Sequence, residues 1–155
     1  MRAWPRILAL LLTLAFVQSC SDGDDSPEQQ VRRFIASAVE AGEARSTSDL
    51  LDLAHRDYSD ERGNNRKRLE GLLRAYFFRH KNIHLFTRID HIEILGDNQA
   101  SVSMHVAMAG TAISDVDALA SLRARIYRFE LQLVREDDWQ LRHASWAPAS
   151  IGAFE

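Results

Sequence analysis

Six histidines are the first residues whose chemistry suggests a site, because a neutral imidazole is a common metal ligand. His80 and His84 are four residues apart, a spacing that places two ligands on one face of a helix. The helix predicted around them ends near Arg79, so this spacing does not bring the two rings together. No glutamate follows His80 in a metalloenzyme pattern, and the chain has one cysteine, at position 20. We therefore predict no metal site and no cofactor.

An acid–base site would need a carboxylate in apolar surroundings, where desolvation raises its pKa toward neutrality. Residues predicted to alternate onto the inner face of a sheet are Ile83, Leu85, Thr87, Ile89, Val102, Met104, Val106, Met108, Tyr127, Phe129, Leu131 and Leu133. None of them is acidic. Asp90 and Glu93 lie near a predicted bend and are assigned to solvent. The pattern therefore disfavours acid–base catalysis and assigns no catalytic residue.

Four hydroxyl side chains could orient a ligand inside an apolar cavity: Tyr58, Tyr76, Thr87 and Tyr127. The competing interpretation is structural, because a tyrosine hydroxyl at the rim of a core usually finds a hydrogen-bond partner. An apolar cavity with a few hydroxyl groups would suit a hydrophobic ligand, but it could equally be filled by its own side chains. The sequence leaves both alternatives open.

The strongest charge feature is the basic run 66–68 with further Lys and Arg residues up to position 88. Aromatic residues interrupt it, but helical spacing directs Tyr76 and Phe77 to the core and leaves Phe78 on the polar side. The chain carries a formal net charge of −3, which disfavours nucleic acid as a partner. A solvated helix face is the simpler interpretation, and contact with anionic headgroups is the alternative.

The N-terminal residues 1–19 have the layout of a secretory signal. Arg2 and Arg6 precede an apolar stretch at 7–17, which is shorter than the roughly 20 residues of a membrane span. The boundary Val-Gln-Ser-Cys at 17–20 resembles the bacterial lipobox. That resemblance implies that Cys20 receives a diacylglyceryl group and becomes an acylated N-terminus, which anchors the protein to a membrane.

Residues 20–26 follow as a lipidated cysteine and a short, flexible, acidic tether. We expect a lipid-anchored protein of the cell envelope that faces the periplasm. Ser21, directly after the cysteine, resembles the sorting choice for the outer membrane, so the outer membrane is favoured over the inner one. The domain has no second cysteine and hence no internal disulfide, although export leads to an oxidising compartment.

The remaining residues, 27–155, predict one α+β domain. Apolar residues recur at helical spacing over 27–42, over about 46–54 and over 65–79, with a short extended piece around Tyr58. The stripe expected on the third helix contains Leu69, Leu72, Leu73, Tyr76, Phe77 and His80. The period then changes to two, which predicts strands over 83–94, 100–108, 127–133 and 139–146. A change of phase near 90–91 predicts a bulge.

Turns are expected at 96–98 and 137–138, a loop over 110–122, and a frayed tail after position 148. Helices that precede a long antiparallel meander predict helices packed on one face of a curved sheet. This element order, with the closing segment Trp139–Trp146, resembles the nuclear transport factor 2-like superfamily, also called SnoaL-like or cystatin-like cones.

The resemblance implies a cone-shaped domain. Members of the superfamily include isomerases, dehydratases and domains without assigned activity, so the fold alone does not name a function. Our leading hypothesis is a non-enzymatic domain that binds an envelope protein or a hydrophobic small ligand. The alternative is a small-molecule lyase or isomerase of the SnoaL-like type. The outer sheet face, often a dimer surface in the superfamily, is polar here, which predicts a monomer or a weak homodimer.

Overall fold

A computed structural model of the protein describes residues 26–122 and 124–154. The predicted signal segment, Cys20 and the acidic tether up to position 25 lie outside the described residues. The described elements follow the order α1 (Pro27–Glu43), α2 (Thr47–Asp52), β1 (Ala54–Asp60), α3 (Arg66–Arg79), β2 (His84–Ile94), β3 (Gln99–Ala109), α4 (Val116–Ser121), β4 (Arg125–Arg135), β5 (Trp139–Pro148) and the 3-10 helix η1 (Ile151–Phe154).

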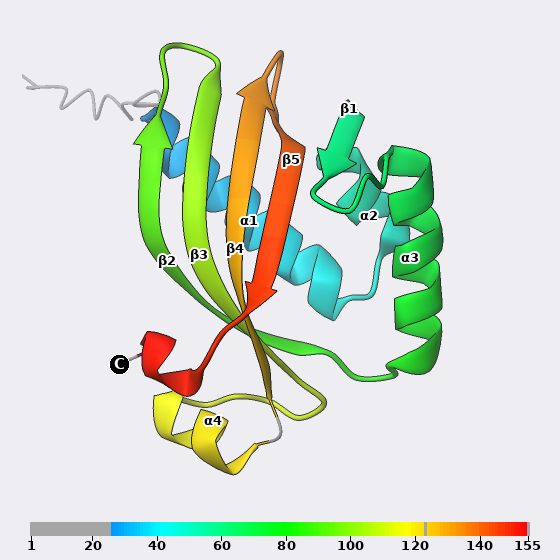
Figure 1. Cartoon of the computed structure of the whole chain (residues 1–155), viewed down its shortest axis with the longest axis vertical. Coiled ribbons are helices and arrows are strands. Elements are labelled where there is room, and N and C mark those ends of the chain that lie inside the picture. The colour runs from blue at the N-terminus through cyan, green and yellow to red at the C-terminus, as the bar shows by residue number, and fades with distance from the viewer. Residues whose placement is uncertain (1–25, 123, 155) are drawn as a thin grey trace, which may run out of the picture.

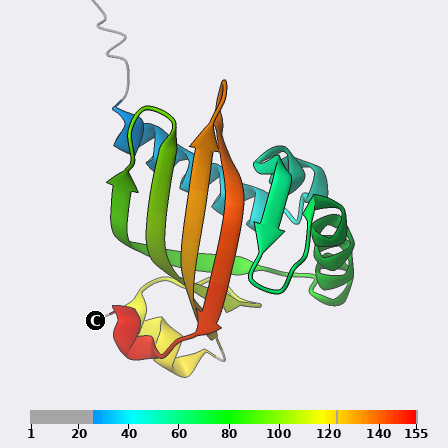
Figure 2. The same ribbon diagram turned by 45° about the horizontal axis from the view of Figure 1, so that its top comes forward.

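The strands form one curved sheet in the order β1-β5-β4-β3-β2, with α1 crossing one face of it (Figure 1). Neighbours among β2 to β5 are antiparallel, and the short β1 joins β5 in parallel. The views in Figures 1 and 2 agree that β1, α2 and α3 lie together at one flank of the sheet. Helix α4 and η1 lie together at the bottom of both views, below the sheet. The α+β prediction, with N-terminal helices on one face of a curved sheet, is confirmed.

Helix α1 begins where the sequence predicts. The Ser26 hydroxyl accepts a hydrogen bond from the Gln29 amide, and the Gln29 side chain accepts one from the Ser26 amide. This reciprocal pair satisfies two amides that a helix leaves unpaired at its start. Val31, Phe34 and Ile35 bury one side of the helix against the sheet. The predicted apolar stripe is therefore the surface that anchors α1.

Two expectations about the other helices are wrong in detail. Helix α2 ends at Asp52, because Ala54 already pairs with Leu141 as the first residue of β1. Helix α3 buries none of its residues fully, and Leu72 is 48% exposed. Its expected inner face is only half-buried because α3 packs beside β1 and α2 at the flank.

The predicted bulge is confirmed, since the register between β2 and β3 shifts between Ile89 and His91. Thr87 lies opposite Val106, and after the shift Ile92 lies opposite Val102. The extra residue returns the apolar side chains of the second half of β2 to the face that α1 covers. The predicted inner face thus persists across the bulge.

The principal core lies between α1 and the sheet, with Val31, Val102 and Leu133 almost inaccessible to solvent. A second cluster lies around Ala107, Leu119 and Phe154. It corrects two expectations: the predicted loop 110–122 contains α4, and the tail after 148 forms η1. Burying apolar side chains from both segments explains why neither stays irregular. Every described helix, strand and core contact lies within residues 26–154.

Candidate functional site

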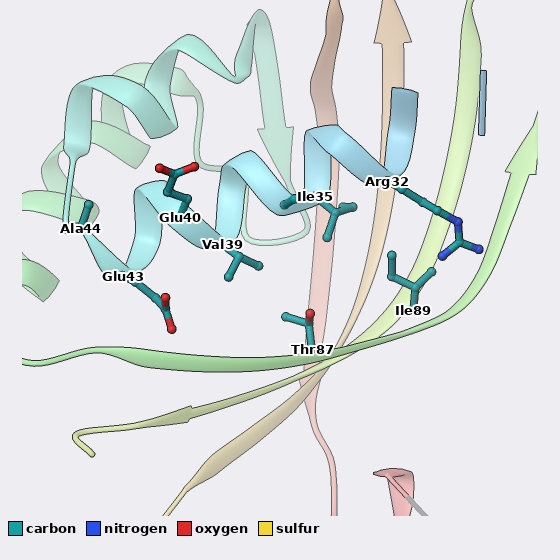
Figure 3. A pocket seen from close by; sticks show the side chains of 9 residues that line it. Arg32, Ile35, Val39, Glu40, Glu43, Ala44, Thr87 and Ile89 are labelled. Atoms are coloured by element: carbon teal, nitrogen blue, oxygen red, sulfur yellow. The ribbon is translucent and has the colours of Figure 1, made fainter. Parts of the chain in front are cut away.

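An open groove of about 620 Å³ lies between α1 and β2 (Figure 3). Most of its lining is apolar, with charged side chains at the rim. The lining residues are Arg32, Ile35, Ala36, Val39, Glu40, Glu43, Ala44, Thr87 and Ile89. Thr87 and Ile89 project from β2 toward the helix, and Ile35 and Val39 project from α1 toward the strand. The groove therefore has an apolar floor and a polar rim.

The C-terminal end of α1 is held close to the start of β2. A Cβ atom on Gly42 would lie only 3.1 Å from the Leu85 Cδ1 atom, so glycine permits this approach. The adjacent Glu43 Oε1 atom accepts a hydrogen bond of 2.8 Å from the Leu85 amide. These two contacts define the end of the groove that contains Glu43.

Strand β2 is an edge of the sheet, so one side of its backbone has no neighbouring strand among the described residues. The bond from the Leu85 amide to Glu43 shows that this amide points away from β3. Backbone groups alternate along an antiparallel strand, so those of Thr87 and Ile89 point to the same free side. The groove thus combines an apolar floor with strand donors and acceptors that have no strand partner.

Charge differs between the two ends of the groove. Arg32 lies at one end, where its guanidinium is 2.8 Å from Glu28. Glu40 and Glu43 lie toward the other end, where the Glu43 side chain points toward β2 and that of Glu40 points away from it, along the rim (Figure 3). The Glu40 carboxylate has no hydrogen-bond or ion-pair partner in the described part of the chain. The carboxylate end would attract a cationic group and repel an anionic one.

A second, smaller pocket of about 150 Å³ lies between the end of α3 and the ends of β2 and β3. Its lining residues are Tyr76, His80, Asn82, Ile83, Met108, Ala109, Gly110 and Arg125. The Tyr76 hydroxyl lies 3.9 Å from the Met108 sulfur, as a weak hydrogen bond, and its ring lies 4.2 Å from that of His80. Its volume is below the roughly 300–1,000 Å³ that is typical of small-molecule binding sites.

The four predicted ligand-pocket hydroxyls do not line one cavity. Thr87 lies in the groove, and Tyr76 lines the smaller pocket. Tyr58 belongs to the principal core, where burial and then the nearby Asp60 charge raise its pKa to about 12. Tyr127 is half-buried and packs edge-on against Phe129, with ring centroids 6.4 Å apart. Thr87 is the one of the four that borders the larger cavity.

The two acidic residues near the bulge lie away from the groove. Asp90 Oδ2 is 2.7 Å from His105 Nδ1, and its other oxygen is 3.0 Å from Arg88. Glu93 is exposed and lies opposite Ser101. Both residues are exposed, as predicted, and Asp90 additionally forms an ion pair with Arg88 on the sheet.

The sequence analysis missed two buried polar residues, His55 and Asp60. His55 Nδ1 accepts a hydrogen bond from the Asp57 amide, and its Nε2 atom lies 3.4 Å from Glu136. Residues 55–65 are mostly polar in the sequence, and the contacts that bury His55 and Asp60 are not predictable from local spacing. Pairing of Glu136 with His55 depends on a contact between residues 81 positions apart.

Asp60 organises the turn between β1 and α3. Its carboxylate accepts hydrogen bonds from the amides of Arg62 and Asn64, each 2.9 Å, and from the Asn64 side chain at 2.8 Å. Burial alone would raise the pKa of Asp60, but these hydrogen bonds and the Arg62 charge outweigh it and lower the pKa. The Asp-to-Asn spacing of a side-chain-capped turn is the signal that could have identified this role.

No group of three or more His, Cys, Asp or Glu side chains is arranged to hold a metal ion within residues 26–122 and 124–154. His80 caps the C-terminal end of α3 and His84 begins β2, so they do not share a helix face. Among the helices of this same part, none is long and apolar enough to cross a membrane.

Solved structures establish the class of fold. The chain resembles Bd1075 of Bdellovibrio bacteriovorus at 14% identity and a TM-score of 0.63, covering 78% of this chain and 41% of that chain. It resembles a ketosteroid isomerase-like protein from Erwinia carotovora atroseptica at 9% identity and a TM-score of 0.61, covering 81% and 98% of the two chains. The chain therefore spans less than half the length of the Bdellovibrio protein.

A third similar structure is a protein of the NTF2-like family from Streptomyces avermitilis, provisionally named a dehydratase. It shares 16% identity and a TM-score of 0.65, covering 79% of this chain and 95% of that one. No protein-family model matches the sequence, and no curated protein does. The chain has a nuclear transport factor 2-like fold. At these identities the likeness describes the fold and leaves the activity open.

Proposed function

We propose that this protein is a lipid-anchored bacterial envelope protein whose NTF2-like domain is a non-catalytic binding module. Its ligand would be an envelope protein or a hydrophobic small molecule. The observation that carries the proposal is the α1–β2 groove, whose floor is apolar and which is far larger than the second pocket. The lipid anchor rests on the sequence at Cys20.

The composition of the groove favours binding over acid–base chemistry. Its two carboxylates, Glu40 and Glu43, belong to exposed residues, whereas acid–base chemistry needs a carboxylate held in apolar surroundings. The names of two similar structures, an isomerase-like protein and a dehydratase, therefore do not identify a catalytic residue in this groove. No residue of the groove is assigned as the acid or base that a lyase or isomerase would need.

Site-specific photo-crosslinking tests the binding role. A photoreactive amino acid at Ala36, in the groove, should give adducts in intact cells that produce the full-length protein. The matched control is the same substitution at Ala75, an exposed alanine on α3. Adducts from position 36 but not from 75 support the proposal. Equal yields from both positions, or no adduct from 36, would contradict it.

The anchor is tested separately. Radiolabelled palmitate should be incorporated into the wild-type protein, and the membrane fraction should contain it. Cys20→Ala should lose the label and accumulate in unprocessed or mislocalised form. Normal membrane partitioning of that variant would refute lipidation at Cys20, whatever the crosslinking shows.

A further inference from the structure

The backbone edge of β2 beside the groove has donors and acceptors without a strand partner, and a peptide backbone could pair with them. Thr87 and Ile89 line the groove with their side chains and direct their backbone groups to the unpaired side of β2. Natural edge strands are usually blocked by charges, prolines or bulges, because an open edge recruits other chains. In β2 the charged side chains of Arg88 and Asp90 pair with each other, and the backbone edge is engaged or interrupted at two places. Glu43 engages the Leu85 amide, and the bulge follows Ile89.

We propose that an extended segment of a partner protein adds to β2 as a further strand, between this edge and α1. The proposal rests on the proposed function, because it names the partner of the same groove. Strand addition would pair the free donors and acceptors of Thr87 and Ile89 with a peptide backbone. Ala36 on α1 also lines the groove, and its small side chain takes up little of the space an added strand would need.

The lining predicts the sequence pattern of the added strand. Side chains alternate across a strand, so every second residue would face α1. Apolar side chains at those positions would contact Ile35, Val39 and Ile89, which form the floor. At the end nearest Glu40 and Glu43, the added strand would carry lysine or arginine, whose long side chain can reach the carboxylates at the rim of the groove.

Charge and hydrogen bonding favour a peptide over a lipid. A fatty acid or anionic phospholipid would bring its negative group near Glu40 and Glu43, or leave it at the single cation, Arg32, which Glu28 already neutralises. An acyl chain also cannot hydrogen-bond to the amides of the edge. A peptide strand satisfies those amides and can supply the missing positive charge.

Selection from a library of random peptides tests the inference, with the unlipidated domain 26–155 as bait. Enriched peptides should alternate apolar residues and carry Lys or Arg at one end. Glu40→Lys should weaken these peptides by about fivefold, a loss of about 1 kcal/mol, and select acidic residues instead. The control of the same charge change, Glu93→Lys at an exposed position on β2 outside the groove, should leave the original preference intact.

Thr87→Pro tests the backbone contact. Proline removes the amide on the free side of an edge strand, where the β2–β3 pairing does not need it, so the fold should persist. We expect about a tenfold loss of peptide affinity, the loss of one hydrogen bond at about 1.4 kcal/mol. Circular dichroism and the melting temperature verify that the variant is folded.

The outcomes separate the inference from the proposed function. Peptides without alternation, or peptides unaffected by both Thr87→Pro and Glu40→Lys, would overturn strand addition. If the Ala36 crosslinker still gave adducts, those adducts would keep the groove as a binding site for another ligand. N-methylation of a selected peptide provides a second check. Methyl groups on one alternate set of amides should abolish binding, whereas the other set should tolerate them. Equal tolerance of both sets would also overturn the proposal.

Discussion

Glu43 on α1 and Leu85 on β2 are joined by a hydrogen bond of 2.8 Å from the Leu85 amide to the Glu43 carboxylate. The carboxylate occupies the position that a carbonyl oxygen of a neighbouring strand would take. It therefore fixes the helix against the sheet and closes one end of the free β2 edge. The groove beside it owes its shape to this contact and to the close approach of Gly42.

Replacing Glu43 should measure the value of that bond. Glu43→Ala leaves the exposed amide to water, and the free energy of unfolding should fall by about 1 kcal/mol. Glu43→Gln keeps an acceptor oxygen and should lose less than half of that. Urea unfolding of both variants provides the measurement. An equal loss in Ala and Gln would mean that the side-chain oxygen contributes nothing as an acceptor.

Asp60 should make stability fall in acid. Its folded pKa is lowered below 3.8, so its contribution is present at higher pH and is lost as the pH falls through the folded pKa. Asp60→Asn weakens the turn by about 1 to 3 kcal/mol at neutral pH. The gap between wild type and variant should shrink below pH 3.8. A gap that stayed constant down to acid unfolding would contradict the role of the ionised carboxylate.

Tyr58 should act at the opposite end of the pH scale. Its pKa is raised from 10.0 to about 12, so its stabilising effect is present below pH 10 and is lost as the pH rises toward the folded pKa. The full loss would be on the order of 2 to 3 kcal/mol. Tyrosinate absorbance should show one tyrosine titrating late, and Tyr58→Phe should remove it. Late titration that persisted in this variant would assign the raised pKa to another tyrosine.

Phe154 and Phe78 provide a test substitution and its control for the contribution of η1 to stability. Phe154 is 6% exposed and packs on Phe86 with centroids 5.5 Å apart, whereas Phe78 is 77% exposed. Phe154→Ala should lower the free energy of unfolding by about 3 kcal/mol, and Phe78→Ala should change it by less than about 0.5 kcal/mol. Comparable effects in thermal or urea unfolding would show that η1 does not stabilise the sheet.

Periodicity predicted most of the fold, because the spacing of nearby apolar residues determines which face of a helix or strand is buried. The start of α1 at Pro27, the bulge before His91 and the inner faces of the strands all follow from residues within a few positions of each other. Helix α4 and η1 were missed because short segments become ordered only through the distant contacts of Leu119 and Phe154.

The site was less predictable for a related reason. Sequence spacing identifies Thr87 as inward-facing, but not that it borders a groove beside an unpaired edge. That depends on how far α1 lies across β2, which Gly42 and Glu43 set through contacts with Leu85, more than 40 positions away. The hydroxyls of Tyr58 and Tyr127 carried the same local signal as Thr87, yet they lie in the core and on the half-buried sheet.

The most direct test of the groove places a tryptophan side chain in each of the two pockets, one variant at a time. Ala36→Trp should occupy the α1–β2 groove, and Gly110→Trp should occupy the smaller pocket. Full-length wild type and both variants would be extracted from their own membranes in mild detergent and weighed by native mass spectrometry. The account predicts bound mass on wild type and on Gly110→Trp, and none on Ala36→Trp. Bound mass retained by Ala36→Trp and lost by Gly110→Trp would move the binding site to the other pocket and contradict the account.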